Sequence, residues 1–259
     1  MRFRKIHVSW LWIPYLILLP YLGVGKIIGW IFFILSIHEM AHIICAIMFH
    51  YEIERVIIYP FGLSAQIAHM GHGSVFHEIM IISAGPLMHV SFPFIFMSAF
   101  HFGLISNVFM EYLNHMNASI LLFNLLPIYP LDGGRLLQTF FHCFLRFKQA
   151  EKMTYLFSFV NMIFIIYFQL LQGASAIVVL CFLGVQLLYS WRMLVTLQRH
   201  FFHYRLQHPA AFPYILNTKD DLYRARKNIM KNHNGFMEEE TWLRKRLYFY
   251  HAEKKNSRL

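Results

Sequence analysis

The chain has 259 residues, of which 58% are hydrophobic, 18% are aromatic and only 14% are charged. This composition is more apolar than a soluble domain needs, and it indicates a polytopic membrane protein. The net charge of +10 raises the alternative of nucleic-acid binding, but 14 of the 23 Lys and Arg residues lie from Arg192 onward. Basic residues gathered in one tail fit a cytoplasmic segment next to anionic lipid, so nucleic acid is not an expected partner.

Six segments of the chain approach the pattern of a membrane-spanning helix, which needs about 20 mainly apolar residues. They cover residues 8–24, 27–49, 78–100, 117–145, 155–171 and 174–191. Basic residues lie almost entirely on the side of the N-terminus and the tail, because the short connections on the opposite side carry only Lys26. The sequence therefore predicts an α-helical polytopic membrane protein with about six transmembrane helices and both termini in the cytoplasm.

Two stretches depart from the helical pattern. Residues 51–72 combine proline and glycine with β-branched and aromatic residues, which predicts a short β-hairpin at the cytoplasmic membrane surface. The fourth apolar segment is broken around Pro127, Pro130 and Gly133. Unwound backbone at membrane depth persists only where it is buried in protein or lines a water-containing cavity. The broken fourth helix therefore marks part of a functional site.

The composition changes at about residue 198, where the chain becomes charged and polar. We therefore expect a transmembrane domain over residues 1–197 and a cytoplasmic basic tail over residues 198–259. Within the tail, residues 237–253 have the pattern of an amphipathic helix whose apolar face includes Trp242 and Leu243. Such a helix packs on a domain or lies on the membrane, and the sequence leaves both alternatives open.

The second apolar segment contains His38-Glu39-Met40-Ala41-His42. In a helix this spacing places two imidazoles one turn apart on the same face, with the Glu39 carboxylate beside them. The arrangement suits a catalytic zinc ion with two nitrogen ligands and a general base. Because burying three ionisable side chains at membrane depth is costly, a chance occurrence of the motif is the weaker interpretation.

A catalytic zinc site needs a third protein ligand. Asp132 is the acid best placed for this role, because it directly follows the break in the fourth segment. Its structural alternative is a turn residue in Leu131-Asp132-Gly133-Gly134, but beside the histidine pair the ligand interpretation is favoured. Asn124, one turn before Pro127, is a candidate for binding the substrate backbone or the developing oxyanion. A buried Asn that bridges two helices is an equally good interpretation of Asn124.

The motifs over residues 38–42 and 124–134 together resemble the site-2 protease family of intramembrane zinc metalloproteases. Ala84-Gly85-Pro86 resembles the small-residue motif that lies between them in this family, and the resemblance covers roughly residues 5–205. It implies a zinc metalloendopeptidase that cleaves a membrane-associated substrate. It also implies roles for five residues, with zinc ligands His38, His42 and Asp132, catalytic base Glu39 and substrate-binding residue Asn124.

Three further segments resemble the members of this family that act in sporulation, namely Lys5-Ile6-His7, Tyr59-Pro60-Phe61-Gly62 and Arg199-His-Phe-Phe-His203. The resemblance implies a membrane-associated pro-sigma factor, pro-sigma K, as substrate and two inhibitory membrane proteins as partners. It implies a location in the mother-cell membrane around the forespore, and it leaves oligomerisation open. Residues 213–236 resemble only the opening strand and helix of a cystathionine-β-synthase (CBS) domain, so the tail is interpreted as a remnant of that domain.

Two other functions compete with proteolysis. A metal transporter is expected to show internal repeats and polar residues in several spans, and the sequence shows neither. An inactive, substrate-binding relative of the family is expected to have lost the base or a ligand. Glu39 and all three candidate ligands are present, so the sequence predicts an active zinc metalloendopeptidase.

Overall fold

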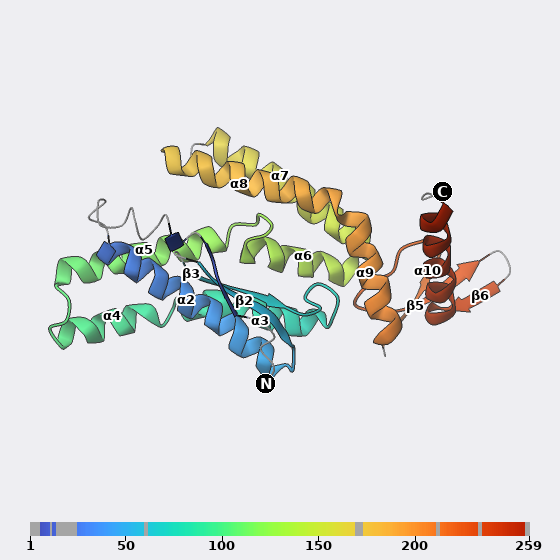
Figure 1. The fold of residues 1–259 in the computed structure, drawn as a ribbon, viewed down its shortest axis with the longest axis horizontal. Coiled ribbons are helices and arrows are strands. Elements are labelled where there is room, and N and C mark those ends of the chain that lie inside the picture. The colour runs from blue at the N-terminus through green and yellow to red at the C-terminus, as the bar shows by residue number, and fades with distance from the viewer. Residues whose placement is uncertain are drawn as a thin grey trace. The chain divides into compact units, whose positions relative to one another are not determined.

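The structure is a computed structural model that describes residues 6–10, 12–13, 25–59, 62–168, 173–210, 213–232 and 235–256. The chain forms two compact units. The first consists of Met1–Met70 and Phe76–Leu126, and the second of Gly71–Val75 and Pro127–Leu259. Helices dominate both units, and each unit also contains one small sheet (Figure 1).

The first unit contains four helices, α2 (Gly25–Met48), α3 (Val75–Met88), α4 (Phe92–His101) and α5 (Asn107–Asn124). At 1.5 Å per residue, the 24 residues of α2 extend about 36 Å, enough to cross a hydrocarbon layer of about 30 Å. The segment Val75–His101, which comprises α3 and α4, is also long and apolar enough to cross a membrane. Ile34, Phe92, Phe96 and Leu113 form a buried cluster between α2, α4 and α5.

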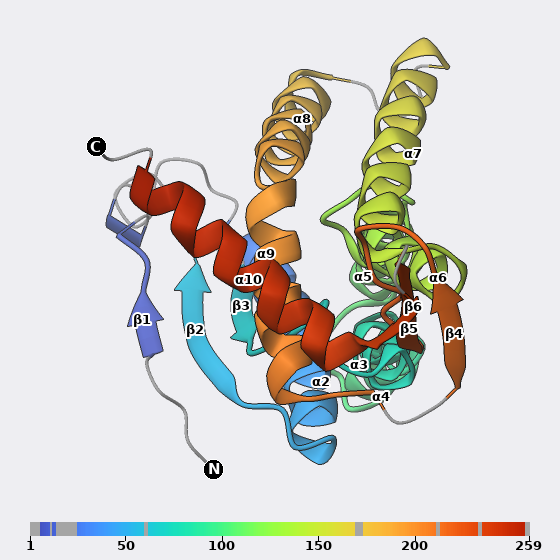
Figure 2. The ribbon, with the colours of Figure 1, turned by 90° about the vertical axis from the view of Figure 1, so that its right-hand side faces the viewer.

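The sheet of the first unit has the order β1–β2–β3 (Figure 2). Strand β2 (Ile53–Tyr59) pairs antiparallel with β3 (Gly62–Ile67), within the region where the sequence predicts a hairpin. On its other side β2 pairs in parallel with β1 (Ile6–Val8), a strand that the sequence analysis did not foresee. Strand β3 packs against α2, so the sheet lies beside the helix that carries the two histidines.

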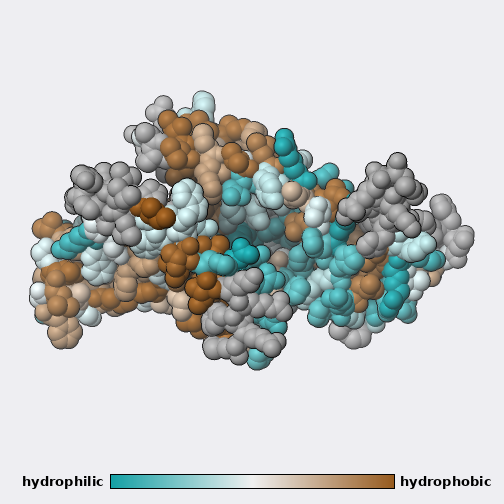
Figure 3. Space-filling view, viewed as in Figure 1, coloured by the Kyte–Doolittle hydropathy of each residue, from teal (hydrophilic) through white to brown (hydrophobic). Residues whose placement is uncertain are grey.

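The helices of the second unit are α6 (Asp132–Phe144), α7 (Phe147–Tyr167), α8 (Ala174–Arg192) and α9 (Leu194–Gln207). Helix α5 of the first unit ends at Asn124 and α6 begins at Asp132, so the fourth apolar segment is interrupted as expected. Helices α8 and α9 are long and apolar enough to span a membrane only when they are taken together, and they meet at a bend of 59°. Hydrophobic residues gather over α8, whereas hydrophilic residues are more frequent over α9 (Figure 3).

The C-terminal part of the second unit contains β4 (Tyr214–Asn217), β5 (Lys227–Asn232), β6 (Gly235–Glu238) and α10 (Glu239–Asn256). Its core contains Phe201 and Phe202 from α9 and Leu243 and Leu247 from α10, with Trp242 packed against it. The apolar face of α10 therefore packs on its own domain, which decides between the two alternatives left by the sequence. The ring of Phe147, at the start of α7, stacks on Phe201 with the ring centroids 4.2 Å apart and joins the same core.

The structure contains two helices that are long and apolar enough to span a membrane, or three if the bent α8–α9 pair counts as one, among the described residues. The count of six therefore stays a prediction. Residues 14–24 of the predicted first span lie outside the described residues, as do Lys5, Pro60 and Phe61 of the sporulation-type segments. The predicted domain boundary at residue 198 falls within α9, and the division there also stays a prediction.

Candidate metal centre

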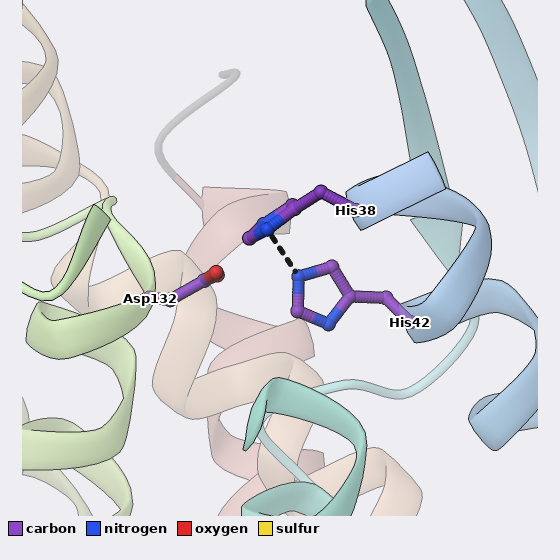
Figure 4. A group of neighbouring side chains, drawn as sticks. All are labelled: His38, His42 and Asp132. Atoms are coloured by element: carbon purple, nitrogen blue, oxygen red, sulfur yellow. Dashed lines mark hydrogen bonds between the residues drawn. The ribbon is translucent and has the colours of Figure 1, made fainter. Parts of the chain in front are cut away.

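The side chains of His38 and His42 lie one turn apart on α2, and both are buried, with 5% and 6% of their surfaces exposed. Their Nε2 atoms are 3.1 Å apart, as the dashed line in Figure 4 shows. Nδ1 of His42 lies 2.7 Å from the carbonyl oxygen of Ile81 on α3. Because a carbonyl only accepts hydrogen bonds, Nδ1 of His42 carries the proton, and Nε2 presents its lone pair toward His38.

Two arrangements fit this short contact between Nε2 atoms. Nε2 of His38 donates a hydrogen bond to Nε2 of His42, or both atoms present lone pairs that require a cation between them. In a typical metal-binding histidine, one ring nitrogen binds the metal and the N–H of the other donates a hydrogen bond to a backbone carbonyl or a carboxylate. The donor chemistry of the pair therefore fits a metal ion such as zinc.

Gly85 on α3 leaves the space beside the two imidazoles open. A Cβ atom at this position would lie 2.3 Å from Nε2 of His42 and 2.7 Å from Cε1 of His38. Real Cβ atoms essentially never approach other atoms so closely. Glycine is therefore required at position 85 because any side chain would displace the imidazoles, which gives a physical reason for the small-residue motif 84–86.

The carboxylate of Glu39 lies on the same helix and is half-buried. Its Oε1 atom accepts a hydrogen bond of 2.7 Å from the backbone N–H of Ala65 on β3. This bond fixes the carboxylate at the strand that packs on α2, and it uses an N–H that β3 does not give to β2. The sheet therefore holds Glu39 in a single position beside the histidine pair.

Asp132 belongs to the second unit, where it is the first residue of α6 and only 8% exposed (Figure 4). Its position in the first turn places the carboxylate where the helix dipole favours negative charge. Two contacts fix the preceding loop. The backbone N–H of Tyr129 donates to Oγ of Ser158 at 2.9 Å, and a Cβ atom at Gly134 would lie 2.3 Å from the carbonyl carbon of Ile128. Asp132 thus sits at a rigid junction between loop and helix.

Asn124, the last residue of α5, is half-buried. Within the described residues its side chain makes no hydrogen bond, so its amide is available to a ligand. The alternative that Asn124 bridges two helices needs a partner, and the described part of the chain supplies none.

Two residues beside His38, namely His89 and Asn117, were not proposed as site residues from the sequence. Nε2 of His89 lies 3.0 Å from Nδ1 of His38, and Nδ1 of His89 lies 2.7 Å from Oδ1 of Asn117. His89 and Asn117 are 1% and 4% exposed. Both are buried polar residues within apolar segments of the chain, and this property makes them candidates for a functional site.

Comparisons with known proteins find a matching family model, a related sequence and a related fold. The model of Peptidase family M50 matches residues 99–168, which include Asn124 and Asp132 but not the histidine pair. The chain is 33% identical over 208 residues to Stage IV sporulation protein FB of Bacillus subtilis (strain 168), which covers 78% of this chain and 69% of that protein. A solved structure, the site-2 protease from Methanocaldococcus jannaschii, matches with a TM-score of 0.54. This match covers 73% of this chain and 93% of that chain at 20% identity, so it concerns the fold alone.

Proposed function

Since this chain belongs to peptidase family M50, the site-2 protease family of membrane metalloproteases, we propose that it is a zinc endopeptidase that cleaves a membrane-associated substrate. The observation that carries the proposal is the buried pair of imidazoles on α2. Their Nε2 atoms converge, and α2 is long and apolar enough to cross a membrane. Buried ionisable groups in such a helix indicate function rather than packing.

His38, His42 and Asp132 are the proposed metal ligands. All three are buried, and two imidazoles with one carboxylate form a donor set that zinc accepts in catalytic sites. When bound, zinc supplies Lewis acidity, which polarises a carbonyl group and lowers the pKa of water toward neutrality. The interrupted segment before Asp132 supports this role, because an unwound stretch at membrane depth requires a protein or aqueous environment.

Glu39 is the proposed general base. Its carboxylate takes the proton from the attacking water and later passes it to the leaving amine. The hydrogen bond from Ala65 to Oε1 holds the carboxylate in place. A base that is fixed before the substrate arrives does not have to be ordered during the reaction.

An extended substrate fits this site better than a helical one, because a helix hides its carbonyl groups in internal hydrogen bonds. We propose that the substrate segment lies along the edge of β3, next to Glu39, and pairs with the strand through backbone hydrogen bonds. Asn124, whose side-chain amide is without a partner among the described residues, would bind the substrate backbone or the developing oxyanion.

The proposed substrate is a membrane-associated pro-sigma factor, pro-sigma K, in the mother-cell membrane around the forespore. The similarity to Stage IV sporulation protein FB supports this assignment, as it supports inhibitory membrane proteins as partners. The decisive experiment is co-expression with the candidate pro-sigma factor followed by a mobility assay. A faster-migrating product that requires Glu39 supports the proposal. If no product forms although the purified enzyme retains zinc, the substrate assignment is wrong.

The proposed topology places both termini in the cytoplasm. Cysteine labelling tests it in a chain whose native Cys45, Cys143 and Cys181 are replaced. Single cysteines in place of Glu52 and Lys148 should react with an impermeant reagent only from the cytoplasmic side. A cysteine in place of Glu111 should react only from the opposite side, and the reverse pattern would invert the topology and exclude a cytoplasmic pro-sigma factor.

The enzyme from the co-expression experiment also distinguishes proteolysis from the two alternative functions, metal transport and substrate binding without cleavage. A metal transporter would move zinc across vesicles whether or not Glu39 is present. An inactive relative would bind the substrate without cleaving it. Cleavage that is lost with Glu39→Gln is expected from neither.

A further inference from the structure

Asn117 on α5, His89 in the α3–α4 turn and His38 on α2 form a continuous line of hydrogen bonds. The distances are 2.7 Å from Asn117 Oδ1 to His89 Nδ1 and 3.0 Å from His89 Nε2 to His38 Nδ1. All three side chains are at most 5% exposed, so water does not compete for these bonds. The line ends at His38, which is one of the proposed zinc ligands.

A second contact of Asn117 fixes the direction of this line. Its Nδ2 atom donates a hydrogen bond of 3.0 Å to the backbone carbonyl oxygen of His89, so its Oδ1 atom must face Nδ1 of the same residue. An amide oxygen only accepts hydrogen bonds, so Nδ1 of His89 carries a proton. In the neutral imidazole, Nε2 of His89 is then an acceptor, and Nδ1 of His38 must donate to it.

We propose that Asn117 and His89 are positioning residues that hold His38 in the tautomer that binds metal. With its proton on Nδ1, His38 presents the lone pair of Nε2. His42 does the same, because its Nδ1 donates to the Ile81 carbonyl. The two Nε2 atoms then lie 3.1 Å apart with their lone pairs directed to the same place, which is the arrangement that two nitrogen ligands of one metal ion need.

Neighbouring side chains limit the orientations that the His89 ring can adopt. The ring of Phe92, which is fully buried, packs against it with centroids 5.6 Å apart. The side chain of Asn117 donates a hydrogen bond to the backbone of His89, and this bond links α5 to the α3–α4 turn. Groups of this kind, which orient a ligand without touching the metal, typically contribute about 10–100-fold to metal affinity.

The test measures zinc affinity in detergent-solubilised, full-length protein, by competition with a chelator. His89→Leu, which removes the acceptor for His38, should weaken zinc binding about 10–100-fold. His89→Gln should restore most of it, because its Oε1 atom can accept from His38 while its amide nitrogen donates to Asn117. Asn117→Leu should weaken binding less, since His89 stays present but can exchange tautomers. His115→Leu, which removes an exposed imidazole two residues earlier on the same helix, is the matched control and should bind zinc normally.

Replacing zinc by cobalt gives a spectroscopic measurement that does not change when the protein merely becomes less stable. The visible absorption of bound Co²⁺ reports the geometry of its ligands, and it should change in His89→Leu but not in Phe92→Leu, which loosens the same packing and keeps the hydrogen bonds. Unchanged zinc affinity and an unchanged cobalt spectrum in well-folded His89→Leu would overturn the proposal. So would failure of His89→Gln to bind zinc better than His89→Leu.

A measurement on the unmutated, metal-free protein covers the case in which the variants do not fold. Nitrogen-15 NMR of the histidine side chains should place the proton of His38 on Nδ1, and a proton on Nε2 overturns the proposal. The inference rests on the proposed zinc protease, but the two fail differently. If the unmutated protein binds no zinc, the proposed function is wrong, whereas normal zinc binding with the opposite tautomer or an unaffected His89→Leu variant rejects only the positioning role.

Discussion

Two buried polar regions of this molecule differ in the partners that their polar groups face. In the C-terminal part of the second unit, Arg205 donates to Oε1 of Glu239 and to the carbonyl oxygens of Arg224 and Arg226. The other oxygen of Glu239 accepts from the backbone and side chain of Asn228, so the network closes on itself. This closure is what a buried structural network needs, because an unpaired buried group is costly.

The region around the α2 histidines brings two imidazole nitrogen atoms face to face. The Nδ1 atoms of His38 and His42 have fixed partners, whereas their Nε2 atoms face each other across 3.1 Å. Two converging imidazole nitrogen atoms are the arrangement that two nitrogen ligands of one metal ion need. Buried polar groups are common to both regions, and the convergence of the two Nε2 atoms is what supports the proposed metal site.

Glu39→Gln gives the largest expected effect and tests the chemical role proposed for the region around the histidine pair. The amide cannot accept a proton, so cleavage should fall by about 10²–10⁴-fold. Zinc content and membrane insertion should stay the same, because the proposed ligands are intact. Cleavage in the co-expression assay and zinc content per chain are the two measurements. Cleavage at the level of the unmutated enzyme would remove Glu39 from the mechanism.

Gly85→Ala should fill the space that the histidine pair leaves open. Its methyl group would lie 2.3 Å from Nε2 of His42, so the imidazoles must move. A displacement of about 1 Å at a reacting centre can cost about 100-fold in rate, and zinc affinity should fall with it. Gly29→Ala on α2 is the matched control, since a Cβ atom there has nothing within 4 Å. Equal activity of the two variants would show that the space beside the imidazoles has no role.

Asp132→Asn tests whether the third ligand lies in the second unit. An amide oxygen is a poorer zinc ligand than a carboxylate, so zinc affinity and cleavage should fall together, by at least about 10–100-fold. Zinc titration and the mobility assay on the same preparation measure both. Normal zinc content with persistent cleavage would mean that Asp132 is only a turn residue.

Glu239→Gln tests the closed network by the same kind of change. It removes the charge opposite Arg205 but keeps most of the shape, so unfolding of the C-terminal domain should become easier by about 1.5–3 kcal/mol. Thermal unfolding in detergent measures the loss, and zinc affinity should be unchanged. A parallel loss of zinc would mean that the C-terminal domain supports the metal centre and that the two regions are not independent.

The sequence was sufficient to predict those placements of candidate site residues that depend on one continuous motif. The spacing of His38 and His42 was sufficient to predict that their imidazoles lie one turn apart with Glu39 beside them, because a helix fixes which residues share a face. The interruption before Asp132 could also be predicted, since proline and glycine mark it directly. In both cases the signal is local in the chain.

The parts that could not be predicted depend on contacts between distant segments. Asn117 and His89 are 28 residues apart, and no local pattern indicates that they share hydrogen bonds. Strand β1 pairs with β2 across about 50 residues, and its three residues are too few for a strand pattern. The sequence also left open whether α10 packs on a domain or on lipid, because an apolar face predicts burial without naming what covers it.

The smallest expected effect concerns Asp221, a carboxylate whose burial is only partly offset by its hydrogen bonds. Burial raises the pKa of Asp221 above 3.8, although the backbone N–H of Lys148 and the side chain of Gln198 donate to it. Between the unfolded and the folded pKa the native state binds more protons, so the contribution of Asp221 to stability is largest below the unfolded pKa. It decreases as the pH rises through the folded pKa.

Thermal unfolding from about pH 4 to pH 7 should show the unmutated protein losing stability relative to Asp221→Asn as the pH rises. Asp220→Asn, which removes the neighbouring, exposed carboxylate, controls for the loss of one charge. A difference between Asp221→Asn and the unmutated protein that grows in the opposite direction would show that the hydrogen bonds to Asp221 outweigh its burial, and that this carboxylate belongs to the closed network after all.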